Sequence, residues 1–185
     1  MDSSERHSVL VRVTHWINTL SFFALVVSGI AILLAHPRLY WGETGSLGTA
    51  SLLDLPLPFI LTGQSGWGRY LHFLAAWVCV LNGLLYAVAG LATRHFQKQE
   101  SYNRLQRLTY LAVVFVLFPL MIATGLAMSP AITSVVPALV EVFGGQQSAR
   151  TIHFFVTNLL VIFLFVHVAM VGFTGNFRAM ITGRL

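Results

Sequence analysis

The chain has 185 residues, of which 56% are hydrophobic and only 9% are charged, and its mean hydropathy is +0.76. An ordinary soluble domain has about 25% charged residues, so this composition excludes the soluble globular class and indicates a membrane protein. The formal net charge of +5 is not accompanied by a patterned basic and aromatic surface, and we expect no nucleic-acid partner.

Four apolar stretches are long enough for a transmembrane α-helix, which needs about 20 residues. They cover residues 13–35, 70–92, 108–128 and 151–173. No low-complexity segment or linker divides the chain, so we predict one transmembrane domain over residues 1–185 with an all-α fold, an integral membrane four-helix bundle. Pro119 lies inside the third stretch, where it predicts a kink in the helix.

The first stretch follows a short polar segment with Arg6 and Arg12, as a cleavable signal peptide would. Its apolar run is longer than that of a usual signal peptide, and it ends in Ala-His-Pro-Arg instead of a small-residue cleavage site. We expect this stretch to be retained as the first span.

The positions of lysine and arginine predict the orientation, because positive residues near span ends stay in the cytoplasm. Eight of the eleven lie at the two ends of the chain or in the link between the second and third spans. These eight are Arg6, Arg12, Arg94, Lys98, Arg104, Arg107, Arg178 and Arg184. We therefore expect both termini to face the cytoplasm.

Two long links, residues 36–69 and 129–150, face the opposite side in this orientation. Links of this length in a helical bundle are often functional. Both contain apolar segments, which either cover the end of the bundle or contact the membrane interface or another protein. The sequence leaves these alternatives open.

Four of the seven histidines lie in the predicted spans, where an imidazole is a candidate functional group. They are His15, His72, His153 and His167. Three of them follow an arginine by three residues, in RVTH, RYLH and RTIH, so each arginine shares a helix face with its histidine. For any single histidine, the alternative role is a hydrogen bond to a neighbouring helix.

His153 and His167 are 14 residues apart, which in an α-helix is a rise of about 21 Å and an angular offset of about 40°. Both therefore face the same side of the bundle, one near each membrane surface. In the predicted orientation, His15 lies at the inner level with His167, and His72 lies at the outer level with His153. The spacing predicts two histidine pairs at two depths, and the third span contributes no ligand.

Two imidazoles that face each other in a bundle core can bind one haem iron from both sides, so two pairs predict two haem groups. Zinc is a poorer match because it requires three or four ligands close together. Cys79 is the only cysteine, which excludes an internal disulfide and a C-x-x-C-H motif. We therefore predict two non-covalent b haems in the bundle core.

The arginines beside these histidines could bind the haem propionates, since guanidinium groups pair well with carboxylates. Arg69 and Arg150 would serve the outer haem, and Arg12 the inner one. Their alternative role is membrane topology alone. Gly29 follows His15 by 14 residues, so it lies on the same face at the outer level and would leave room for the macrocycle.

A proton or metal transporter with a histidine relay is the alternative from another class. It would need polar residues between the two depths, yet only Thr157 and Asn158 are polar between His153 and His167. A second alternative is a haem-free membrane anchor for a partner. We predict no catalytic residue, and an electron-transfer subunit of a membrane oxidoreductase complex rather than an enzyme alone.

Several of these residues also resemble a known family. His-Trp at 15–16, Arg-x-x-His at the start of the second span and the two histidines of the fourth span are similar to the bacterial di-haem cytochrome b561 group. This group includes the b-type subunits of nickel-iron hydrogenase, formate dehydrogenase and thiosulfate reductase. HPRLYWGETG at 36–45 and GRYLHFLAAW at 68–77 resemble the thiosulfate reductase type most.

The resemblance covers all four spans and implies a bacterial inner-membrane, respiratory-chain cytochrome with the four histidines as iron ligands. It implies electron transfer between the quinone pool and a periplasmic subunit that carries molybdopterin, an iron–sulfur cluster or c-type haem. Some relatives bind quinone near the inner haem, which corresponds here to the region of Arg12, His15, Trp16 and Asn18. Others react directly with quinone and small oxidants such as superoxide, which gives a direct quinone-linked oxidoreductase as a further alternative.

Overall fold

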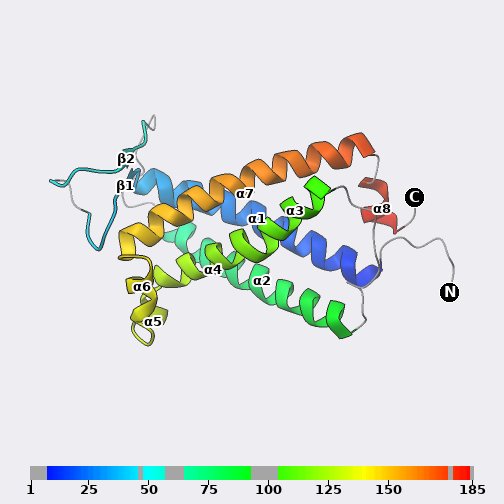
Figure 1. The fold of residues 1–185 in the computed structure, drawn as a ribbon, viewed down its shortest axis with the longest axis horizontal. Coiled ribbons are helices and arrows are strands. Elements are labelled where there is room, and N and C mark those ends of the chain that lie inside the picture. The colour runs from blue at the N-terminus through cyan, green and yellow to red at the C-terminus, as the bar shows by residue number, and fades with distance from the viewer. Residues whose placement is uncertain (1–7, 46–47, 57–64, 93–103, 175–176, 184–185) are drawn as a thin grey trace. The chain divides into compact units, whose positions relative to one another are not determined.

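The computed structural model describes residues 8–45, 48–56, 65–92, 104–174 and 177–183. These residues are mostly helical (Figure 1), which confirms the predicted all-α class. Among them, four helical stretches are long and apolar enough to cross a membrane: Val9–Ala35, Gly66–Ala92, Leu108–Ala127 and Gln146–Phe173. The chain is therefore a multi-pass membrane protein, and its four long apolar helices are consistent with the predicted bundle.

The helices begin earlier than the apolar stretches that predicted them. α1 covers Val9–Ala35, α2 covers Ser65–Ala92 and α7 covers Gln146–Thr174. At the start of α1, the side chain of Ser8 accepts a hydrogen bond from the backbone N–H of Val11 at 3.4 Å. Hydropathy marks only the apolar part of a span, whereas helical hydrogen bonding continues into the polar residues before it.

The third span is not one regular helix. α3 (Arg104–Ala112) leads into a π-helical turn, η2 (Val113–Leu117), and α4 (Phe118–Ala127) follows. The N–H of Phe118 donates to the carbonyl of Val113, five residues back. Pro119 has no N–H to continue the α-helical pattern, and this π turn lies directly before the helix that contains it, whereas the predicted kink stays a prediction.

The chain forms two compact units. The first comprises residues 1–36, 57–100 and 169–185, and it includes α1, α2 and the short α8 (Phe177–Thr182). The second comprises residues 37–56 and 101–168, and it includes the third span and α7 up to residue 168. A single domain over residues 1–185 stays a prediction, and each unit is described here by itself.

In the first unit, α1 packs along α2, and a glycine allows the two helices to approach closely. A Cβ atom on Gly68 would lie 3.1 Å from the Cβ of Ala31 and 3.4 Å from the carbonyl oxygen of Ser28. Near the N-terminal end of α1, Asn82 of α2 is buried and donates two hydrogen bonds to α1. Its Nδ2 lies 2.7 Å from the carbonyl oxygen of Thr14 and 2.8 Å from Oδ1 of Asn18.

In the second unit, part of the first long link covers the start of α7. β1 (Arg38–Leu39) pairs antiparallel with β2 (Leu53–Asp54), and the following Gly42 carbonyl accepts hydrogen bonds from the N–H groups of Gln147 and Ser148 at 3.0 and 3.3 Å. Thr151 Oγ1 donates to the carbonyl of Tyr40 at 2.7 Å. These residues are therefore a cap on the protein's own helix, while residues 57–64 of the same link lie outside the described residues.

An ion pair closes the two-stranded sheet on its exposed side. Nε of Arg38 lies 3.0 Å from Oδ2 of Asp54, and the nearby carboxylate raises the pKa of Arg38 above its usual value.

The second long link contains two short helices, α5 (Pro130–Thr133) and α6 (Ala138–Val142). Of the eight positive residues used for orientation, Arg6, Arg94, Lys98 and Arg184 lie outside the described residues.

Candidate functional site

His72, one of the predicted ligands, points at a serine on the neighbouring helix of the first unit. Its Nδ1 lies 3.0 Å from Oγ of Ser28 on α1. Ser28 is fully buried, and its hydroxyl also donates to the carbonyl of Ala24 in its own helix at 2.6 Å. Gly68 is one helical turn before His72, and the close approach that it allows brings this imidazole to α1.

His153 has the same arrangement in the second unit. Its Nδ1 lies 2.9 Å from Oγ1 of Thr124 on α4, and Thr124 is also fully buried. The Thr124 hydroxyl donates to the carbonyl of Leu120 at 2.8 Å. α4 and α7 also meet where Oγ1 of Thr157 lies 3.9 Å from the sulfur of Met121.

These contacts favour one tautomer of each imidazole. A hydroxyl has one hydrogen, and in Ser28 and Thr124 a backbone carbonyl of the same helix lies in position to accept it. The hydroxyl oxygen then accepts the hydrogen bond from Nδ1–H of the histidine, which leaves the lone pair on Nε2. A neutral imidazole with its lone pair on one nitrogen and its other N–H hydrogen-bonded is the usual form of a metal ligand.

A glycine lies beside each of these two rings. A Cβ atom on Gly29 or on Gly125 would lie 3.6 Å from Cε1 of His72 or His153, respectively. Gly29 was expected to leave room for a macrocycle at this level, and it adjoins a predicted outer ligand. Sequence reasoning missed Ser28, Thr124 and Gly125, although a hydroxyl-glycine pair at 28–29 and 124–125 was a readable signal.

The other two histidines have aromatic surroundings. His15 lies on α1 between Thr14 and Trp16, and Thr14 is the residue whose carbonyl accepts from Asn82. The rings of His15 and Trp16 meet edge to face at 5.6 Å. In the second unit, the ring of His167 stacks on Phe163 with centroids 5.8 Å apart.

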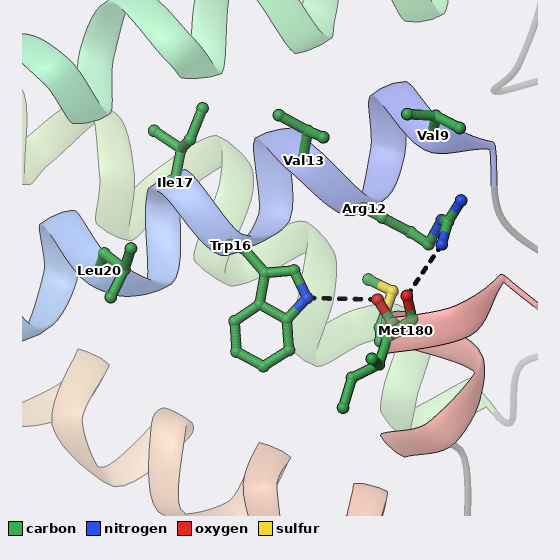
Figure 2. A pocket seen from close by; sticks show the side chains of 8 residues that line it. Val9, Arg12, Val13, Trp16, Ile17, Leu20 and Met180 are labelled. Carbon is green, nitrogen blue, oxygen red and sulfur yellow. Dashed lines mark hydrogen bonds between the residues drawn. The ribbon is translucent and has the colours of Figure 1, made fainter.

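Arg12 and Trp16 hold α8 against α1. Nη1 of Arg12 donates to the carbonyl of Ile181 at 2.9 Å, and Nε1 of Trp16 donates to that of Met180 at 3.2 Å (Figure 2). Nε of Arg12 is buried and has no hydrogen-bond partner among the residues that the structure describes. A groove of about 340 Å³ runs beside these contacts, lined by Val9, Arg12, Val13, Trp16, Ile17, Leu20, Met180 and Ile181.

The other two predicted propionate partners differ in their surroundings. Arg69 is exposed at the start of α2. Arg150 is half-buried, and its Nη1 donates to the carbonyl of Arg38 at 3.1 Å, so it also supports the cap on α7. Each predicted histidine pair has one member in each unit, and the pairing stays a prediction.

The residues fit a non-covalent haem. Imidazoles on apolar spanning helices carry the donor atoms that haem iron takes, and Ser28 and Thr124 favour the tautomer that ligation needs. The buried Nε–H of Arg12 is a donor suited to an anionic or carbonyl oxygen. Four apolar helices with such histidines fit a membrane cytochrome of the b type.

Comparison with known proteins identifies the family. The sequence model of prokaryotic cytochrome b561 matches residues 6–183, and the chain belongs to this family. A protein of Azospira oryzae that carries the name protein-methionine-sulfoxide reductase subunit YedZ1 is 28% identical in an alignment of 192 positions, which spans 90% of this chain and 89% of that protein. No solved structure shows significant similarity to the chain. The predicted recognition is confirmed: the chain is a b-type haem protein of membrane electron transfer.

Proposed function

We propose that this protein binds two b haems and conducts electrons between membrane quinone and a redox partner on the outer face of the bacterial inner membrane. His15 and His167 hold the inner haem, His72 and His153 the outer one, and both termini lie in the cytoplasm. The observation that carries the proposal is the pair of hydroxyl-to-imidazole contacts, at 3.0 Å for His72 and 2.9 Å for His153. Like surroundings are expected of two residues that act as axial ligands of one group.

The chain's own residues supply ligation and orientation. Bound haem contributes a one-electron Fe(II)/Fe(III) couple. Arg12, Arg69 and Arg150 are the proposed partners of the haem propionates, because a guanidinium group pairs well with a carboxylate. Thr157 and Asn158 each donate to a carbonyl of their own helix, at 2.8 Å, so these contacts lend no support to a proton relay along α7.

The groove beside α1 is the proposed quinone site. Its wall is an apolar face of the first span, which suits a ring and tail that enter from the lipid. Arg12 and Trp16 line it, as the family resemblance implies, and the Arg12 guanidinium is a donor suited to a quinone oxygen. Quinol oxidation there would release two electrons and two protons, and quinone reduction would take up the same numbers.

The partner is a periplasmic redox subunit. The Azospira oryzae relative is named as a subunit of a protein-methionine-sulfoxide reductase, and its similarity covers most of both chains. The family resemblance implies a subunit that carries molybdopterin, an iron–sulfur cluster or c-type haem. The name of this relative favours a catalytic subunit that reduces methionine sulfoxide in proteins. Electrons would then flow outward from quinol.

Haem counting tests the proposal directly. The protein purified from membranes should show a reduced b-type spectrum with two haems per chain. We expect His72→Ala and His153→Ala to remove the same haem, and His15→Ala and His167→Ala to remove the other, as judged by redox titration of the remaining haem. A colourless wild-type protein would refute the haem assignment, and loss of different haems within one pair would refute the pairing.

A further inference from the structure

The two units contain the same short sequence pattern twice. The first copy consists of SGIA at residues 28–31 and GRYLH at residues 68–72. The second copy consists of TGLA at residues 124–127 and ARTIH at residues 149–153. In both copies a hydroxyl residue is followed by glycine and, three residues on, by alanine. In both copies a small residue precedes the histidine by four positions and an arginine precedes it by three.

The structure gives both copies the same contacts. Each hydroxyl meets Nδ1 of its histidine, at 3.0 and 2.9 Å, and donates to the carbonyl four residues back, at 2.6 and 2.8 Å. Each glycine lies beside Cε1 of the ring at the same distance. The alanines and the small residues before the histidines, Ala31, Ala127, Gly68 and Ala149, are all buried.

We propose that Ser28 and Thr124 are matched positioning residues, which hold His72 and His153 as Nδ1–H tautomers and direct both Nε2 atoms to a single haem. This inference rests on the proposed function, in which these histidines are the outer axial pair. If the two histidines only filled space, there would be no reason for each to have its own hydroxyl residue followed directly by a glycine. There would also be no reason for a small residue to lie four positions before each histidine.

The hydrogen bonds have a consequence for redox chemistry. An imidazole that donates its Nδ1–H is a more basic ligand at Nε2, and a more basic ligand favours ferric iron. Removing either hydroxyl should therefore raise the midpoint potential of the same haem. Since the hydroxyls also restrain the ring orientation, the low-spin ferric EPR signal of that haem should shift as well.

Four variants of the full-length protein test this, with redox titration and EPR as readouts. Ser28→Ala and Thr124→Val remove the hydroxyls with little change in volume. Two variants are controls. Thr124→Ser keeps a hydroxyl and has the same side chain as Ser28 in the other copy, and Ser21→Ala removes a second buried serine of α1. We expect an upward shift of one haem potential in the first two variants and the wild-type potential in the last two.

The outcomes separate this inference from the proposed function. If wild type binds two haems but Ser28→Ala and Thr124→Val leave both potentials at the control values, the positioning role is wrong and the haem assignment stands. A shift of a different haem in each variant also overturns the matched role. If Thr124→Val does not accumulate in membranes, Thr124→Ala repeats the test, and Ser28→Ala decides independently in the other unit.

Discussion

Replacing Asn82 with leucine should loosen the contact between α1 and α2. Asn82 donates two hydrogen bonds to α1, at 2.7 and 2.8 Å, and it is 7% exposed. An interhelical hydrogen bond in a membrane protein contributes about 0.6 kcal/mol on average and up to about 1.7 kcal/mol. The two bonds together predict a loss of about 1 to 3 kcal/mol for Asn82→Leu, in which the new side chain has the same branching but no polar atom.

The assay is reversible unfolding of the purified protein in mixed micelles by added SDS, followed by circular dichroism. Asn158→Leu is the matched control, because Asn158 is exposed and its Nδ2 donates to Phe154 of its own helix at 2.8 Å. We expect the control to change the free energy of unfolding by less than about 0.5 kcal/mol. If both variants unfold at the same SDS fraction, Asn82 does not hold the two helices together as argued.

Two further predictions concern the ends of the spans. Arg12→Ala should weaken the contact of α8 with α1, because one of the two hydrogen bonds described between them is lost. A loss of about 1 kcal/mol predicts that trypsin cleaves at Arg178 roughly fivefold faster than in Leu20→Ala, a matched variant of the groove wall. Equal cleavage rates would contradict the contact. Thr151→Val should destabilise the cap on α7 by about 1 kcal/mol, since the buried hydroxyl no longer reaches the carbonyl of Tyr40. Hydrogen exchange of residues 38–42 measures this, and Thr133→Val, whose hydroxyl bonds within its own helix, should leave exchange there unchanged; faster exchange in both variants would contradict the assignment.

The spans could be predicted from the sequence because a bilayer imposes length and hydropathy on each one separately. The four histidines could be identified as candidate ligands because a polar ring is rare in a membrane-spanning stretch. The arrangement around them could not be predicted. Ser28 and Thr124 are ordinary residues of apolar helices until a neighbouring helix brings an imidazole within 3.0 Å of them.

Contacts between residues that are far apart in the chain could not be predicted from the sequence either. The hydrogen bonds of Arg12 and Trp16 to α8 join residues more than 160 positions apart, and a hydropathy pattern does not predict which distant residues meet. Arg150 was predicted from a local pattern with His153, yet its Nη1 donates to a backbone carbonyl of the first long link. A local motif identifies candidate donors, whereas their acceptors depend on the packing of distant segments.

The cap on α7 has a consequence for biosynthesis. Gly42 and Tyr40 find their partners more than 100 residues later, at Gln147, Ser148 and Thr151. In the proposed orientation, a chain that enters the membrane from its N-terminus would export the first long link well before the helix that completes its hydrogen bonds has been made. Folding of this segment must wait for insertion of the fourth span, so a ribosome-bound chain stopped before residue 146 should leave it open to protease.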